Sequence, residues 1–94
     1  MNKEELYKLA IETYGDEAQI NQGVEEMAEL IQAINKFRRN PGEETLKGIE
    51  EEIADVEIML EQYKIIFAAG IAEEWIKEKK LHRLAERLGV KNYD

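Results

Sequence analysis

The 94-residue chain has no cysteine, one histidine and a single proline, Pro41. The absence of thiols excludes disulfide bonds and thiolate metal sites, and a lone imidazole argues against a zinc site. Proline interrupts helices, so its scarcity leaves long helices free to form on both sides of Pro41. No run approaches the roughly 20 apolar residues that a membrane span needs. We therefore expect a protein that does not insert into a membrane.

Positive charge is also scarce, because 13 Lys and Arg residues stand against 21 Asp and Glu residues, for a net charge of −8. A nucleic-acid polymer is bound through a basic surface, so the composition argues against such a partner. The N-terminal segment mixes charged and apolar side chains and lacks the basic start and apolar run of a signal peptide. These features predict a cytoplasmic protein.

The short length predicts a single domain over residues 1–94. A chain of this size buries a smaller fraction of its surface than a larger domain does, so its stability margin is thin. A second copy can cover apolar surface that one copy leaves exposed. We therefore expect a homo-oligomer, either a homodimer or a homotetramer.

Glycine and proline divide the chain into four segments with helical periodicity. The dividing residues are Gly15, the turn Asn40-Pro41-Gly42, Gly70 and Gly89. We expect helices over residues 2–14, 17–39, 43–69 and 71–88, with Asp16 as the N-cap of the second. Little favours strands, so the predicted fold class is all-α, in the form of a four-helix bundle.

The second predicted helix places an acidic pair, Glu26 and Glu29, on an arc that also carries apolar residues. With Glu26 at the origin of a helical wheel, five apolar side chains fall between roughly 80° and 160° and form the expected core stripe. They are Ile20, Val24, Met27, Ile31 and Ile34. Glu29 falls at about 300°. The arc of the acidic pair also holds Leu30, Ala33 and Phe37.

The third predicted helix repeats this arrangement with Glu52 and Asp55. With Glu52 at the origin, its apolar stripe lies at roughly 40–100° and Asp55 at about 300°. The stripe consists of Ile49, Ile53, Val56, Leu60 and Phe67. Three other acids, Glu50, Glu57 and Glu61, gather on the far side. Both acidic pairs therefore have apolar neighbours, while other acids face the solvent.

Like charges three residues apart repel each other on a helix, and apolar surroundings increase the cost. A hard divalent cation reverses this effect, because Mg²⁺ prefers oxygen ligands from carboxylates and phosphates. Two facing helices would present four carboxylates to one cleft. The alternative is a set of solvated acids, since Glu-x-x-Glu also occurs by chance in any acidic helix.

The residues around the two pairs resemble a known family. Glu25-Glu26-Met27-Ala28-Glu29-Leu30, followed by Glu52-Ile53-Ala54-Asp55-Val56, looks like the ExxE…ExxD signature of the MazG-like all-α nucleoside triphosphate pyrophosphohydrolase superfamily. The segments 18–20, 58–62 and 80–88 also resemble small phage and bacterial members. The resemblance covers residues 14–89 and is more specific for the superfamily than for a substrate.

The resemblance implies a catalytic metal site for Mg²⁺, with Mn²⁺ as a substitute, held by Glu26, Glu29, Glu52 and Asp55. It implies hydrolysis of a nucleoside or deoxynucleoside triphosphate to the monophosphate and pyrophosphate, as in nucleotide-pool clean-up. Bound metal ions would neutralise phosphate charge and lower the pKa of an attacking water.

A polyphosphate substrate also needs cations, and the last predicted helix supplies them. Lys80, Arg83 and Arg87 are spaced so that they share one helix face. The resemblance favours substrate binding by Lys80 and Arg83, whereas the alternative is a solvated face that complements the helix dipole. Gln19, which shares the arc of Glu26, is a further candidate for substrate binding. The alternative role for Gln19 is a structural one, in which its side chain forms a polar hydrogen bond at an interface.

Two other functions stay open at this stage. Phosphoribosyl-ATP pyrophosphohydrolase, of histidine biosynthesis, is a related enzyme with the same bundle and acidic motifs. A non-catalytic helical module for oligomerisation or partner binding is the alternative of another class, although all four ligand positions are filled. A Ca²⁺ sensor would need a D-x-[DN]-x-[DN]-G loop, which the sequence lacks.

Overall fold

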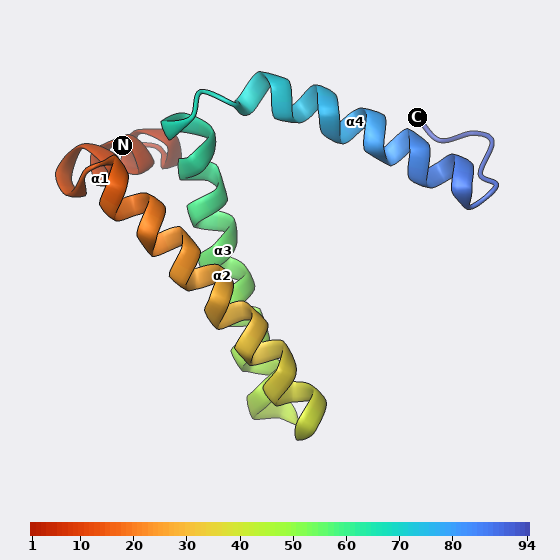
Figure 1. Ribbon diagram of the computed structural model, residues 1–94, viewed down its shortest axis with the longest axis horizontal. Helices are drawn as coiled ribbons and strands as arrows, with labels where there is room; N and C mark the ends of the chain where they lie inside the picture. The colour runs from red at the N-terminus through yellow and green to blue at the C-terminus, as the bar shows by residue number, and fades with distance from the viewer.

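The computed structural model describes residues 1–94 and contains four helices and no strand. The helices are α1 (Lys3–Tyr14), α2 (Asp16–Arg39), α3 (Glu43–Ile66) and α4 (Gly70–Arg87). Helices α2 and α3 form a long antiparallel hairpin, α1 packs beside both at the open end of the hairpin, and α4 extends away from them (Figure 1). The all-helical prediction is confirmed. The packed part of the chain is α1, α2 and α3.

The helix starts differ in one respect from the prediction. Asn2 caps α1, because its side chain accepts a 2.8 Å hydrogen bond from the Glu5 backbone N–H in a capping box. The prediction that Asp16 is the N-cap of α2 is wrong, because Asp16 is the first helical residue. The preceding Gly15 takes the cap position with a φ of 93°, which a residue without Cβ adopts easily. The Asp16 carboxylate still lies in the first turn, where negative charge is favoured.

The end of α3 also differs, because the helix stops at Ile66 rather than at residue 69. Ala68 adopts a left-handed φ of 51°. The Ala69 N–H donates to the Lys64 carbonyl at 2.9 Å and the Ala68 N–H to the Ile65 carbonyl at 3.2 Å, which is a Schellman motif. This motif usually uses glycine at the left-handed position, so the sequence pointed to Gly70 instead. At the end of α4, Gly89 takes the expected position, with a φ of 72°.

The contact between α2 and α3 depends on a glycine. Gly23 is buried, and the ring of Tyr63 occupies the space that a side chain there would fill. The Tyr63 hydroxyl donates a 2.6 Å hydrogen bond to the Ile20 carbonyl. Val56 and Met59 of α3 are buried in the same interface. These contacts bring the two helices together along the arc of α2 that carries Glu26.

The predicted core stripe of α2 is therefore not the core of a single chain. Val24 is 56% exposed and Ile31 is 61% exposed, and Ile34 is exposed as well. On α3, Ile53 and Leu60 of the second stripe are also exposed. The stripes are uncovered because the acid-bearing arcs, rather than the most apolar arcs, face each other between the two helices.

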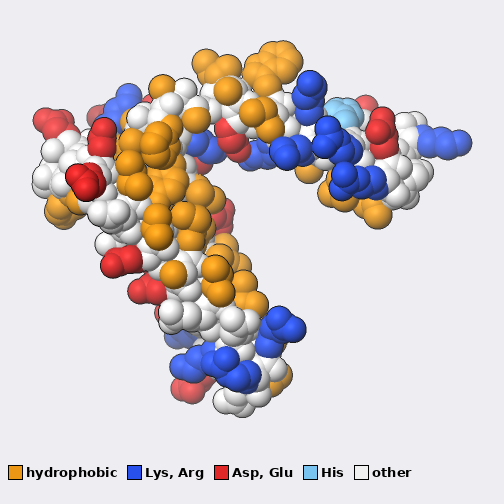
Figure 2. Space-filling view, viewed as in Figure 1, with side chains coloured by type: hydrophobic (Ala, Val, Ile, Leu, Met, Phe, Trp, Pro, Cys, Tyr) orange, Lys and Arg blue, Asp and Glu red, His pale blue; other side chains and the backbone are white.

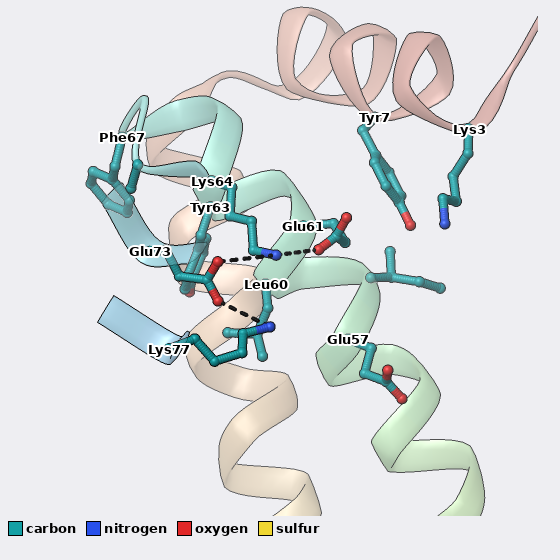
Figure 3. Close-up of a pocket in the computed structure, with 12 residues that line it drawn as sticks. Lys3, Tyr7, Glu57, Leu60, Glu61, Tyr63, Lys64, Phe67, Glu73 and Lys77 are labelled. Carbon is teal, nitrogen blue, oxygen red and sulfur yellow. Dashed lines mark hydrogen bonds and ion pairs between the residues drawn. The ribbon is translucent and has the colours of Figure 1, made fainter. Parts of the chain in front are cut away.

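Helix α4 joins the rest of the chain at an ion-pair network. The Lys64 ammonium lies 2.8 Å from a Glu61 carboxylate oxygen and 3.6 Å from one of Glu73, and Lys77 lies 3.3 Å from the other Glu73 oxygen. These groups line a cavity of about 650 Å³ between α1, α3 and the start of α4 (Figure 3). Beyond this joint, α4 has one buried residue, Ala85. No helix combines the length and the apolar character that crossing a bilayer requires.

Two glycine substitutions test the packing between α2 and α3. We expect Gly23→Ala to lower the free energy of unfolding by about 1–3 kcal/mol, because the added methyl group overlaps the Tyr63 ring. Gly48→Ala is the matched control, since nothing lies within 4 Å of a Cβ at that position. It should raise the free energy of unfolding by about 0.5–1 kcal/mol through helix propensity alone. Urea unfolding followed by circular dichroism measures both, and equal effects of the two substitutions would contradict the packing described.

Candidate functional site

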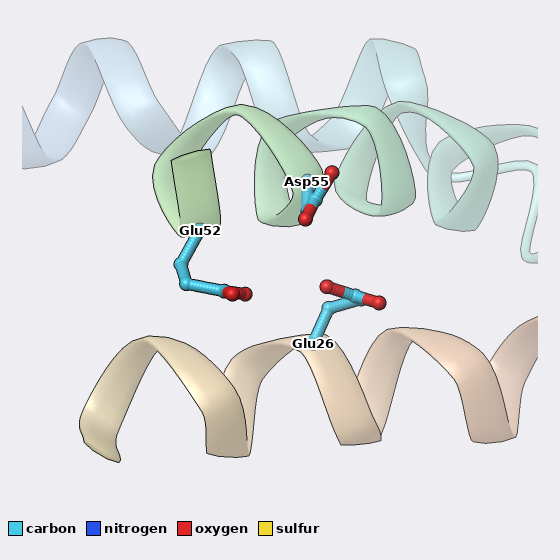
Figure 4. Close-up of side chains that lie close together, drawn as sticks. All are labelled: Glu26, Glu52 and Asp55. Carbon is cyan, nitrogen blue, oxygen red and sulfur yellow. The ribbon is translucent and has the colours of Figure 1, made fainter. Parts of the chain in front are cut away.

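Three carboxylates meet between α2 and α3. Glu26 comes from α2, whereas Glu52 and Asp55 come from successive turns of α3 (Figure 4). One oxygen from each lies within 4.8 Å of the others. The antiparallel hairpin produces this cluster because it places the middle of α2 beside the first half of α3. The expectation that the two motifs lie on facing helices is therefore met for these three residues.

The cluster contains oxygen atoms without partners. Glu26 and Glu52 each have one carboxylate oxygen, Oε2, that is shielded from solvent and accepts no hydrogen bond. The other oxygen of Glu26 accepts a 2.7 Å hydrogen bond from the Gln22 amide. None of the ion pairs of the protein involves the cluster. Buried carboxylate oxygens in native proteins are normally paired, so these two atoms leave room for a ligand.

Glu29 lies at the edge of this cluster. Its side chain is exposed and does not belong to the group of three. Its negative charge nevertheless acts on both partly buried acids, since it raises the pKa of Glu26 and that of Glu52. The fourth predicted ligand is thus close enough to contribute to the electrostatics of the site.

The mutual repulsion is visible in the pKa values. Partial burial raises the pKa of Glu26 above its ordinary value of 4.5, and the Glu29 and Asp55 carboxylates add to this while the Gln22 hydrogen bond opposes it. Partial burial likewise raises the pKa of Glu52, and the charges of Glu29, Glu26 and Asp55 act in the same direction. Both groups therefore hold their protons more tightly than isolated carboxyl groups do.

The donor set of this cluster consists entirely of oxygen. Carboxylates are the ligands of hard divalent cations such as Mg²⁺, Mn²⁺ and Ca²⁺, and soft thiolate ligands are absent from the chain. A bound cation would satisfy the two unpaired oxygens and convert repulsion among the acids into attraction. The residues present thus fit a site for a hard cation.

Gln19 does not face the open part of the cleft. It is buried between the helices, where its side-chain amide donates a 2.7 Å hydrogen bond to the Gln62 side-chain oxygen. This is the polar hydrogen bond at an interface that was the alternative to substrate binding. Its proposed role toward a substrate remains a prediction.

The predicted phosphate-binding residues are not near the acids of their own chain. Lys80 and Arg83 lie on α4, which points away from the hairpin (Figure 1). Both side chains are exposed. His82, between them, is also exposed, and its ring packs edge-on against Tyr93 with the ring centroids 5.0 Å apart. A single copy therefore brings the acids together but keeps the cations apart from them.

Sequence reasoning missed the polar residues that support the cluster. Gln62 pairs with Gln19, Tyr63 fixes α2 against α3, and Gln22 orients Glu26. The signal was present for Gln62, because it lies two helical turns after Asp55 on the same arc. For Tyr63 the missing clue was the pairing with Gly23, which only the three-dimensional contact reveals.

The raised pKa values predict how the stability of the metal-free protein depends on pH. The folded state holds the protons of Glu26 and Glu52 more tightly than the unfolded state, where the pKa is near 4.5. The free energy of unfolding should therefore decrease as the pH rises from 4.5 through the raised values. Glu61 has the opposite shift, mainly through its hydrogen bond with Lys64, but its contribution is lost only as the pH falls below that range.

Thermal melts in a chelating buffer between pH 5 and 8 measure this dependence. Glu52→Gln should raise the melting temperature at pH 8 and flatten the slope, because it removes one repelling charge. Glu50→Gln, at an exposed position on the other side of α3, should leave the slope unchanged. A slope that is the same in wild type and Glu52→Gln would contradict the electrostatic account.

The cluster has to be interpreted through its own chemistry, because no family model matches the sequence and no curated protein or solved structure is similar to the chain. Two features bear on the function: the arrangement of the acids between α2 and α3 and the resemblance of the two acidic motifs.

Proposed function

We propose that the protein is a Mg²⁺-dependent hydrolase that converts a nucleoside or deoxynucleoside triphosphate into the monophosphate and pyrophosphate. The observation that carries this proposal is the meeting of Glu26, Glu52 and Asp55, with two buried and unpaired carboxylate oxygens. The choice of reaction comes from the resemblance of both motifs to the MazG-like superfamily. Without that resemblance the cluster would support only a hard-cation site.

The acids have distinct roles in this proposal. Glu26 and Glu52 use their unpaired oxygens as ligands, and Asp55 and Glu29 complete the carboxylate set from the edge of the cleft. Mg²⁺, or Mn²⁺ in its place, would neutralise phosphate charge and make a bound water more acidic. Gln22 holds the Glu26 carboxylate in one orientation through its 2.7 Å hydrogen bond. The α–β anhydride bond breaks with the consumption of one water molecule, which yields the monophosphate and pyrophosphate and leaves the protons of the water on the products or in the solvent.

The net charge of −8 makes cations essential for a polyphosphate substrate. Phosphate oxygens and the acid cluster repel each other unless positive charge lies between or beside them. Lys80 and Arg83 are the proposed source of that charge at the substrate. Such an enzyme would act on the nucleotide pool of the cytoplasm.

We also propose that the active form is a homodimer or homotetramer. The surface area of one chain is 7680 Å². A compact protein of this mass exposes about 5,600 Å² by the usual scaling with molecular mass. The excess of roughly 2,000 Å² per chain is in the range that a stable interface between copies covers. The uncovered stripe with Val24 and Ile31 on α2 is the surface that a second copy would bury.

The test begins with ligand-dependent stability and product release. Mg²⁺ together with a non-hydrolysable triphosphate should raise the melting temperature, since a ligand at a hundred times its Kd adds about 2.7 kcal/mol to the free energy of unfolding. Pyrophosphate release from a panel of nucleoside and deoxynucleoside triphosphates should require Mg²⁺ or Mn²⁺. A preference for phosphoribosyl-ATP would instead identify the enzyme of histidine biosynthesis.

Two matched variants locate the chemistry. Glu52→Gln should keep the helical circular dichroism spectrum and lower kcat by at least about a hundredfold, because losing a metal ligand removes several kcal/mol of transition-state stabilisation. Glu50→Gln makes the same chemical change on the opposite side of α3 and should retain activity. Hydrolysis that survives in Glu52→Gln with the same Mg²⁺ dependence would overturn the site. If the wild-type protein shows no nucleotide-dependent shift and no pyrophosphate release, a non-catalytic helical module is the better interpretation.

A further inference from the structure

Helix α4 presents an amphipathic face that nothing in its own chain covers. Leu84 and Leu88 lie on one side of the helix, about 40° apart on a helical wheel, and Lys80 and Arg87 lie on the adjoining side. Leu88 is 70% exposed and Leu84 is 49% exposed. A seam of leucines bordered by cations is the pattern of a helix that packs on a surface with apolar and acidic groups.

The joint between α3 and α4 keeps this face away from its own hairpin. Only residues 67–69 separate the two helices, and Ala68 in its left-handed conformation sets the direction in which the chain leaves α3. Glu73, in the first turn of α4, is paired with both Lys64 and Lys77 (Figure 3). Of these two pairs, the Glu73–Lys64 ion pair links the first turn of α4 to α3, and α4 points outward from the open end of the hairpin (Figure 1).

The charges of the two parts are complementary. Five cations and one acid lie between Lys79 and Lys91. The hairpin has the opposite composition around its cluster, because the segments 25–29 and 50–57 contain eight carboxylates and no cation. Figure 2 shows Lys and Arg side chains gathered on the far part of α4. The hairpin of a second copy therefore offers the acidic surface that complements the cations of α4.

The apolar stripe and the acid cleft lie on different sides of the hairpin. This explains why α4 would have to extend around a second copy to reach its cleft. On α2 the apolar stripe is centred near 120° and Glu29 lies near 300° on the same wheel, so they point to opposite sides. A second hairpin packed on the stripe leaves the acid cleft open. Only a segment that extends beyond the hairpin, such as α4, is then placed to approach the cleft from outside.

We propose that residues 70–94 form an arm that docks on the hairpin of a second copy, with its basic end beside the acid cluster of that copy. The arm accounts for part of the excess surface of roughly 2,000 Å² per chain, and its leucine seam is buried in the contact. The docking itself does not depend on the proposed enzymatic activity. The assignment of Lys80 and Arg83 to the phosphates at the partner's site does rest on it.

The absence of native cysteine allows a direct test. The double variant Arg87→Cys/Glu51→Cys places one thiol on the cation-bearing side of the arm and one beside Glu52 on the acid side of α3. A short bis-maleimide should join two copies and give a covalent dimer on a denaturing gel. When the variant is first denatured and refolded with a large excess of wild type, this product should disappear, since most double-cysteine copies then pair with a chain that has no thiol.

A contact within one chain gives the opposite result. An internally bridged monomer, detected by its intact mass and insensitive to dilution with wild type, would overturn the proposal. The control Arg87→Cys/Glu50→Cys moves the second thiol to the other side of α3 and should give little cross-linking. Equal yields from the two double variants would also overturn it, because the arm would then have no preferred docking side.

The leucine seam is tested through the dissociation constant of the dimer. Leu84→Gln should weaken self-association at least tenfold in analytical ultracentrifugation. Glu86→Gln creates the same residue on the opposite side of α4 and should not weaken it. Circular dichroism at high protein concentration checks that both variants keep their helices, and an unchanged dissociation constant for folded Leu84→Gln would contradict the docking.

Mixing two inactive variants tests completion of the site by the partner. Glu52→Gln has an intact arm, and Arg83→Ala has an intact acid cluster. Their mixed dimer contains one complete site if the arm acts on the partner, so an equal mixture should recover about a quarter of the wild-type sites. If the wild type is active and the mixture recovers no activity, the arm serves its own chain and the proposal is overturned. If the wild type hydrolyses no substrate, the proposed function is contradicted. The cross-linking result would still show whether the arm docks on a second copy.

Discussion

The rotation of α2 against α3 determines which surfaces this protein buries and which it leaves open. Gly23 has no side chain, so the Tyr63 ring packs directly against α2 and its hydroxyl reaches the Ile20 carbonyl at 2.6 Å. Buried beside this contact is the hydrogen bond between Gln19 and Gln62. Polar contacts of this kind are specific in direction, because leaving a buried amide unpaired costs about 1–3 kcal/mol. They select the rotation in which the acid-bearing arcs of both helices face each other.

That rotation has two costs, and each indicates a binding partner. Partial burial and repulsion between the carboxylates raise the pKa of Glu26 and of Glu52, and two of their oxygens lack any partner. The apolar stripe of α2, with Val24 and Ile31, is left in the solvent. A bound cation would relieve the first cost, and a second copy packed on the stripe would relieve the second. A single chain with only Val56, Met59 and Ala85 as buried apolar residues has little core to offset either one.

Much of the secondary structure could be predicted from the sequence, because it follows from local signals. Gly15, the turn at Pro41 and Gly89 mark helix boundaries in the structure as they do in the sequence. The end of α3 could not be predicted in the same way, since Ala68 takes a left-handed conformation that alanine rarely adopts. The acid cluster was predictable from spacing, because three of the four predicted ligands, Glu26, Glu52 and Asp55, lie on the arcs that meet. The rotation of the helices was not, since the cleanest apolar stripe of α2 suggested a core that the contact of Gly23 with Tyr63 excludes.

The acids lie on the hairpin and most of the cations near the C-terminus lie on α4. This separation of charge gives the outward position of α4 a physical reason. If Lys80 and Arg83 lay against the acids of their own hairpin, they would pair with the free oxygens of Glu26 and Glu52 and compete with a divalent cation for them. Holding these cations on a separate helix leaves the acid cluster without ion pairs and therefore available to a metal. An ion pair crosses the joint itself, where the Lys64 ammonium of α3 lies 3.6 Å from a carboxylate oxygen of Glu73 on α4. In the proposed dimer, Lys80 and Arg83 would contact the substrate phosphates at the partner's site rather than its carboxylates, so a metal held by the acids and the cations of the arm would bind different oxygens of the polyphosphate.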